Sequence, residues 1–169
     1  MIVDSFKYLP RLIRLMYESI EITPDLPIPW TQLSKPISQS KFGLITSAGF
    51  YQLDQDSPFD IEREKKDPAW GDPSFRVIPS TISQENLGIS HLHVNTIWAK
   101  KDLNVLLPIH RFKELALKGV VGSLAQDAYS FMGYQGYPSD TTSWKNIYAR
   151  KVAKRFEEQG VDCILLVPS

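Results

Sequence analysis

An apolar run directly after a helix is the feature that most constrains the fold of this chain. Residues 161–167 (VDCILLV) predict a strand that is buried on both faces, because buried strands of parallel sheets are nearly continuous hydrophobic runs. The segment from Ser139 to Gln159 predicts a helix that ends at Gly160. Its apolar face comprises Trp144, Ile147, Tyr148, Val152 and Phe156. A helix that leads straight into such a strand indicates a crossover to a parallel strand.

The same alternation of strands and helices extends back along the chain. Strands are predicted at residues 41–49, 75–79 and 128–133, with a helix from Pro108 to a stop at Gly119. Short junctions between these elements predict an α/β fold with three layers and a mostly parallel sheet of the Rossmann or flavodoxin type. Residues 50–84 show little periodicity and contain many acidic residues and prolines, so a long surface excursion with a functional role is expected there.

The first 29 residues form a separate region in this interpretation, and residues 30–169 form the α/β domain. Ser5 to Ile20 has apolar residues at helical spacing and a basic opposite face, which predicts an amphipathic helix. Residues 23–30 contain three prolines and predict an extended arm. We expect the helix to pack on its own domain or on a partner rather than on a membrane.

Composition excludes several classes of partner. Nineteen basic residues balance nineteen acidic ones, so no net charge favours nucleic acid or an anionic membrane. No apolar run reaches the length that crosses a bilayer, and the start lacks the features of a secretory signal. The lone Cys163 has no partner for an internal disulfide, which favours a cytoplasmic protein, and we expect it to be a buried, inert thiol.

Two polar segments are candidates for a functional site. Thr46 and Ser47 follow the first strand but lack the glycine spacing of a nucleotide-binding turn, so no nucleotide cofactor is expected. In an extended segment His91, His93 and Asn95 point to one side. Three interpretations stay open: hydrogen bonds that order the loop, which is the preferred one, a substrate-facing patch, or a metal site that lacks a nearby Glu or Cys at ligand spacing. The third histidine, His110, is expected to be exposed.

The topology predicts where these groups meet. Thr46-Ser47, Gly133-Tyr134 and Pro168-Ser169 all follow predicted parallel strands, so they share the carboxyl end of the sheet. The long segment between residues 50 and 101 leaves and returns at that end. We therefore expect His91 to face a cleft there, beside Ser47 and the end of the last strand.

Several segments, in order, match one family. They are Pro29-Trp30-Thr31, residues 41–49, 71–79, Ser90-His91, residues 102–108, 119–122, 129–134 and 160–166. From Trp30 to Ser169 the chain resembles the selenoprotein B family of glycine, sarcosine, betaine and D-proline reductases. The resemblance implies an oxidoreductase that cleaves a C–N bond of an amino acid or betaine-like substrate, with partner subunits or as a homo-oligomer. His91 is then the candidate catalytic residue, and Thr46, Ser47, Arg76, His93 and Asn95 are the candidates for substrate binding.

In that family the last strand leads into a selenocysteine or cysteine, followed two residues later by a cysteine. A nucleophile at the start of a helix has its pKa lowered by the helix dipole. This sequence stops before that pair, so the resemblance implies an incomplete amino-terminal part, with Ser169 placed where a UGA codon for selenocysteine is misread as stop. We expect the chain alone to be inactive as a thiol-dependent reductase and to expose apolar surface. The alternatives are a non-catalytic binding or assembly module of the same fold, and a metal-dependent enzyme that uses His91 and His93.

Overall fold

A computed structural model describes residues 10–19 and 31–169 of the chain, which divides into the units Met1–Gln32 and Leu33–Ser169. In the first unit, α1 (Arg11–Glu18) confirms part of the predicted amphipathic helix. Nε of Arg14 donates to Glu18 at 2.7 Å, and the side chains of Leu12 and Leu15 are exposed. The remainder of that helix prediction and the proline-rich arm up to Trp30 lie outside the described residues.

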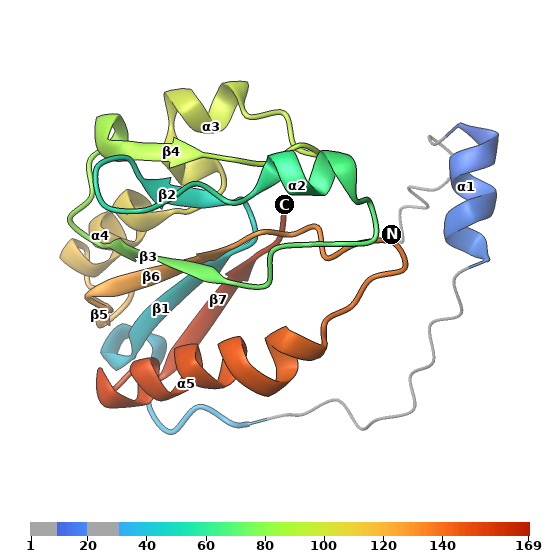
Figure 1. The fold of residues 1–169 in the computed structure, drawn as a ribbon. Coiled ribbons are helices and arrows are strands. Elements are labelled where there is room, and N and C mark those ends of the chain that lie inside the picture. Colours follow the sequence, from blue (N-terminus) through green and yellow to red (C-terminus); the bar gives the residue numbers. More distant parts are fainter. Residues whose placement is uncertain (1–9, 20–30) are drawn as a thin grey trace. The chain divides into compact units, whose positions relative to one another are not determined.

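The second unit is built around the central strand β1 (Lys41–Thr46). On one side β1 pairs in parallel first with β5 (Ser123–Leu124) and then with β6 (Asp127–Phe131). On its other side β7 (Cys163–Val167) pairs with it in parallel, and β3 (Phe75–Pro79) adds to β6 in the antiparallel sense. The predicted α/β fold with a mostly parallel sheet is therefore confirmed (Figure 1).

Alternating strand residues fill two separate cores on the two faces of the sheet. Leu44 and Ala128 belong to the core on the face covered by α3 (Ile97–Lys101) and α4 (Ile109–Leu117). Tyr129 of β6 belongs to the core on the face covered by α5 (Ala149–Glu158), which contributes Val152 and Phe156. Helices thus cover both faces, and the sheet is the middle of three layers (Figure 1).

The two long helices end as the sequence predicts, but one begins later. Gly119 follows α4 with a φ of 68°, and Gly160 follows α5 with a φ of 66°, which is the left-handed conformation that suits glycine at a helix end. The predicted start at Ser139 is too early, because Asp140 Oδ1 accepts the backbone N–H of Thr142 at 2.9 Å and the helix begins at Thr142. Residues Trp144–Tyr148 form a π-helical turn before α5.

Regular structure occurs within the excursion that showed little periodicity. β2 (Phe50–Gln52) pairs antiparallel with β4 (Leu87–Ile89), and α2 (Ile61–Lys66) lies between them in the chain. Asp60 caps α2 by accepting the N–H of Arg63 at 2.9 Å. Short 3-10 turns at Ile37–Gln39, Gln84–Asn86 and Leu103–Val105 complete the second unit. Strands of three residues are too short to show a period, so the sequence did not predict the two-stranded sheet of β2 and β4.

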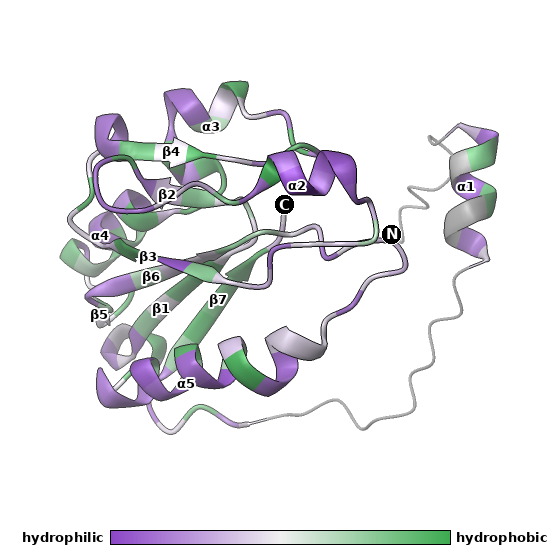
Figure 2. Cartoon of the chain, viewed as in Figure 1, coloured by the Kyte–Doolittle hydropathy of each residue, from purple (hydrophilic) through white to green (hydrophobic). Residues whose placement is uncertain are grey.

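The prediction for the last strand is wrong in one respect. β7 is a strand, but its side chains are not buried on both faces: Ile164 is 46% exposed and Leu166 is 66% exposed. β7 has β1 on one side only, so it is an edge strand within the described residues. Cys163 is half-buried for the same reason, which corrects the expectation of a fully buried thiol. Figure 2 shows that β7 is nevertheless hydrophobic along most of its length.

Candidate functional site

Residues from three strand ends and from the segment after β4 meet at the carboxyl end of the sheet. We define the carboxyl rim as Ser47, His91, Gly133 and Ser169. A Cβ atom added at Gly133 would lie 3.2 Å from Nε2 of His91, 3.2 Å from the carbonyl oxygen of Ser47 and 3.3 Å from the oxygen of Ser169. The absence of a side chain at Gly133 therefore lets these groups approach each other. His91 lies beside Ser47 and the end of the last strand, as the topology predicted.

A glycine turn brings the histidine segment to the rim. Gly49 has a φ of 71°, and a Cβ atom there would collide with the carbonyl oxygen of Ser90. The backbone N–H of Ser90 donates to the carbonyl oxygen of Gly49 at 2.9 Å, and its hydroxyl donates to the carbonyl oxygen of Phe59 at 3.1 Å. Two hydrogen bonds of Ser90 therefore hold the backbone directly before His91 in place.

His91 presents a neutral hydrogen-bond donor to the rim. Its side chain is buried, and Nδ1 accepts the backbone N–H of His93 at 3.1 Å. Since Nδ1 is the acceptor, the neutral ring carries its hydrogen on Nε2. Burial is the larger cause and the neighbouring His93 ring the smaller one, and together they lower the pKa of His91 from 6.5 to about 4, so the His91 ring is neutral at neutral pH. Nε2 is buried and has no hydrogen-bond partner among the described residues.

His93 forms a second polar cluster next to His91. Its Nε2 lies 2.8 Å from Oε1 of Glu64, whose side chain is only 3% exposed, whereas that of His93 is 52% exposed. The His93 ring stacks on Tyr134 with the ring centroids 4.4 Å apart. The ring centroids of His91 and His93 are 6.1 Å apart. The two imidazoles therefore lie close together in different environments, one buried and one half-exposed.

Asn95 does not join this cluster. The backbone bends at residues 92–94, so the expectation of an extended segment with His91, His93 and Asn95 on one side is wrong. Oδ1 of Asn95 instead accepts the N–H of Ile97 at 3.1 Å at the start of α3. A side-chain to backbone bond of this kind competes with extended structure. Within the bend itself, Nδ1 of His91 accepts the backbone N–H of His93 at 3.1 Å.

Thr46 and Ser47 occupy the turn after β1 but differ in accessibility. Thr46 is buried, and its hydroxyl accepts the N–H of Ala48 at 3.2 Å. Oγ of Ser47 accepts the N–H of Ser169 at 2.9 Å and lies 3.2 Å from the hydroxyl of Ser169. Ser47 thus belongs to the rim, whereas the hydroxyl of Thr46 stabilises the turn.

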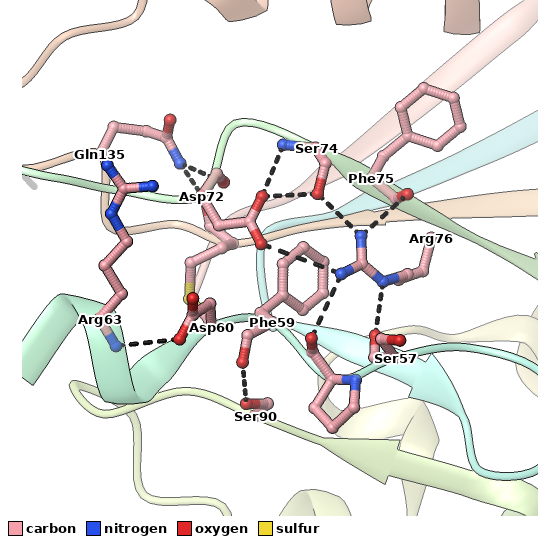
Figure 3. Close-up of polar contacts among 12 residues, drawn as sticks. Ser57, Phe59, Asp60, Arg63, Asp72, Ser74, Phe75, Arg76, Ser90 and Gln135 are labelled. Atoms are coloured by element: carbon pink, nitrogen blue, oxygen red, sulfur yellow. Dashed lines mark hydrogen bonds and ion pairs between the residues drawn. The ribbon is translucent and has the colours of Figure 1, made fainter.

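Arg76 holds the excursion together from a position on β3. Its Nε donates to the carbonyl oxygen of Ser57 at 2.8 Å and Nη1 donates to the hydroxyl of Ser74 at 2.8 Å (Figure 3). The guanidinium lies 4.2 Å from the ring centroid of Phe59, the residue whose carbonyl accepts from Ser90. The contacts of Arg76 are with this loop, so it supports the segment before His91 indirectly.

His110 lies at the start of α4, outside the rim. His110 is half-buried rather than exposed, because its N–H donates to Oδ1 of Asn104 at 2.9 Å, which folds the start of α4 back on the preceding turn. In residues 10–19 and 31–169 no group of three or more His, Cys, Asp or Glu side chains is arranged to hold a metal ion. Within the same ranges no helix is long and apolar enough to cross a membrane.

An apolar groove adjoins the rim. It has a volume of about 620 Å³ and runs between α5 and the uncovered face of β7. Its apolar lining includes Trp144, Ile164 and Leu166, and Ser47 and Ser169 line it as well. One end of the groove is therefore polar and belongs to the rim, and the remainder is hydrophobic.

Sequence reasoning missed Glu64 and the stacking role of Tyr134. Glu64 is one of many acidic residues in the excursion, and its neighbours Glu62 and Lys65 form an exposed ion pair at 2.6 Å. Its position three residues after Ile61 on α2 was the one available signal that it faces inward. Without a predicted helix at residues 61–66 that signal was not usable.

Comparisons with known proteins agree on one family. Residues 17–169 match the family model of glycine/sarcosine/betaine reductase selenoprotein B. Over 147 residues the chain is 31% identical to the D-proline reductase subunit gamma of Acetoanaerobium sticklandii, a match that covers 87% of this chain and 55% of that relative. The chain thus spans about half the length of the curated relative it matches. No solved structure matches significantly.

Proposed function

Since the chain belongs to the glycine/sarcosine/betaine reductase selenoprotein B family, we propose that it forms part of a cytoplasmic reductase that cleaves a C–N bond of an amino acid or betaine-like substrate. The carboxyl rim binds this substrate, and Nε2–H of His91 donates to its carboxylate. The relative is a subunit by name, and we infer that this chain also works with partner subunits.

One observation carries this proposal. His91 is a buried, neutral donor whose Nε2 lacks a protein partner among the described residues and lies next to Gly133, Ser47 and Ser169. A buried donor without an acceptor costs roughly 1–3 kcal/mol, and a bound carboxylate removes that cost. Amino acids and betaines share a carboxylate, so the common part of the substrate class matches the group that the rim presents.

The redox chemistry needs groups beyond those in this chain. Reductive cleavage requires two electrons, and a single thiol does not complete a thiol–disulfide cycle on its own. Cys163 is the one cysteine of the sequence, and it lies at the opposite end of β7 from the rim residue Ser169. We therefore propose that a selenocysteine or cysteine pair outside these 169 residues supplies the nucleophile. The chain alone should yield no product from D-proline or glycine with a dithiol reductant.

A binding experiment tests the assignment of the rim. Calorimetry with glycine, sarcosine, betaine and D-proline should detect binding of at least one of them to the 169-residue chain. The variant His91→Gln should weaken that binding about tenfold, the loss expected for one hydrogen bond to a charged group. His110→Gln, which alters a histidine bonded to Asn104 away from the rim, is the matched control and should bind like the unaltered chain.

The apolar groove favours a second candidate function, a non-catalytic assembly module of the same fold. Exposed Ile164 and Leu166 are the kind of contiguous apolar surface that marks protein interaction sites. If none of the four ligands binds, or if His91→Gln binds as well as the unaltered chain, the reductase site assigned here is wrong and the assembly role is preferred.

A further inference from the structure

We propose that His93 and Glu64 form a recognition site for a protonated amine, so that the carboxyl rim selects a zwitterion that carries N–H groups over a quaternary ammonium compound. This inference rests on the proposed function, because it takes His91 as the donor to the carboxylate of the same ligand. It narrows the substrate class from amino acids and betaines to amino acids.

The buried carboxylate fixes the role of each nitrogen in the His93 ring. Oε1 of Glu64 lies 2.8 Å from Nε2 of His93, and the Glu64 side chain is 3% exposed. A buried carboxylate needs a donor, so the tautomer of His93 that bonds to Glu64 carries its hydrogen on Nε2. Nδ1 is then left with a lone pair that accepts a hydrogen bond.

The surroundings hold the ring in place but leave it accessible. Among the residues that the structure describes, His93 is contacted by Glu64 from α2, by Tyr134 from the segment after β6, and by His91 from its own segment. The Tyr134 ring stacks on it at 4.4 Å with an interplanar angle of 28°. With its side chain 52% exposed, His93 remains open to a solute.

The two imidazoles present complementary groups. His91 offers a donor on Nε2 and His93 offers an acceptor on Nδ1, and the ring centroids are 6.1 Å apart at an angle of 89°. A zwitterionic amino acid carries the matching acceptor and donor in its carboxylate and its ammonium group. Glu64 supplies the negative charge that stabilises the ammonium group, which completes the electrostatic match.

Candidate ligands differ in the number of N–H bonds on their ammonium groups. Glycine and sarcosine carry N–H bonds on their ammonium groups, whereas betaine has none and makes no hydrogen bond to Nδ1. Quaternary ammonium groups are recognised by open aromatic faces, and the Tyr134 face that points toward His93 is already covered by the imidazole ring. Betaine should therefore bind only through its carboxylate, as acetate does.

Nitrogen-15 NMR of the histidine rings in the 169-residue chain tests this directly. Acetate, glycine, sarcosine and betaine should each shift Nε2 of His91. Glycine and sarcosine should also shift Nδ1 of His93, and they should bind about tenfold more tightly than acetate or betaine. Glu64→Gln should abolish the His93 response and reduce glycine affinity to that of acetate. Glu62→Gln, which alters an exposed carboxylate on the same helix, is the matched control and should leave both responses unchanged.

The outcomes separate this inference from the proposed function. If the four ligands shift His91 while His93 does not respond to glycine, the amine site is wrong and the carboxylate site stands. If betaine shifts His93 as strongly as glycine does, the selection for N–H groups is wrong. If His91 responds to no ligand, both proposals fail. The comparison of glycine with betaine on the unaltered chain decides the question even if Glu64→Gln does not fold.

Discussion

β6 and β7 flank the same central strand in parallel, are each five residues long, and yet differ in burial. In β6, Tyr129 is fully buried and Ala128 is 3% exposed, whereas Ile164 and Leu166 in β7 are 46% and 66% exposed. β6 has β3 on its outer side and belongs to the cores on both faces, but β7 has β1 alone. The burial of a strand is thus set by its neighbours and not by its own hydrophobicity.

The same asymmetry continues at the carboxyl rim. The β6 side is closed, since Gly133 and Tyr134 are in contact with the histidine segment. The β7 side opens into the apolar groove that Ser47 and Ser169 line. The rim therefore lies between a side of the domain whose side chains are buried and a side that exposes hydrophobic surface. Four predictions test this contrast.

Truncation of a buried leucine in β1 and of an exposed leucine in β7 should give the largest difference in the free energy of unfolding. Leu44→Ala removes a side chain that is fully buried in β1, and the free energy of unfolding should fall by about 2–5 kcal/mol. Leu166→Ala removes the same atoms from an exposed site and should change it by about 0.5 kcal/mol. Urea unfolding measures both. Equal losses would show that the β7 face is buried in solution.

The turn that brings the histidine segment to the rim should tolerate no side chain. Gly49→Ala places a Cβ atom against the carbonyl oxygen of Ser90 at a φ of 71°, and it should cost about 1–3 kcal/mol. Gly119→Ala is the matched control, because it has a φ of 68° but nothing within 4 Å of the added atom. Its cost in urea unfolding should be about 1 kcal/mol, and the excess at Gly49 measures the contact with Ser90. Identical costs would exclude that contact.

His91 should make the fold sensitive to acid. Its folded-state pKa is lowered from 6.5 to about 4, so between these values the unfolded chain binds a proton that the folded chain does not. Stability should therefore fall as the pH decreases through this window, by at most about 1.4 kcal/mol per pH unit from this group. His91→Gln should flatten the slope in urea unfolding measured at several pH values. His110→Gln should keep it, and a slope that His91→Gln leaves intact would assign the acid sensitivity elsewhere.

A surface change in the groove should have the smallest effect on stability. Leu166→Lys should reduce the fluorescence of a hydrophobic dye and any self-association, while the free energy of unfolding changes by about 0.5 kcal/mol or less. Leu117→Lys alters a residue that is 89% exposed at the end of α4, outside the groove lining, and serves as the control. Equal dye signals for the two variants would locate the dye elsewhere.

The sequence predicted the elements that contain enough residues to show a period. β1, β3, β6, α4 and most of α5 were recognisable from apolar spacing, proline and glycine positions, and the short junctions between them indicated parallel strands. The ribbon of β2 and β4 was missed because its partners are three residues long and pair across residues 50 to 89. The burial of β7 was wrong because an apolar run does not reveal whether it lies at the edge of a sheet.

The site was predicted in part for a similar reason. Topology placed His91 near Ser47 and the last strand, because parallel strand ends share one edge. The stacking of Tyr134 on His93, and the pairing of His93 with Glu64, depend on a bend at residues 92–94 and on a helix at residues 61–66. Neither the bend nor this short helix produces a periodic pattern of apolar residues in the sequence. The position of Asn95 was predicted wrongly because of the same bend, and its side chain instead accepts the N–H of Ile97 at the start of α3.

The position of β1 between strands from the second half of the chain has a consequence for the order of folding during synthesis. Its first residue, Lys41, bonds through its N–H to Asp162, 121 residues later, and its other partners begin at Ser123. At a synthesis rate of about 5–20 residues per second, β7 is synthesised roughly 6–24 s after β1. Throughout that interval the edge of β1 that pairs with β7 is unpaired, and an unpaired edge on a strand as apolar as Phe42 to Ile45 is a site of aggregation.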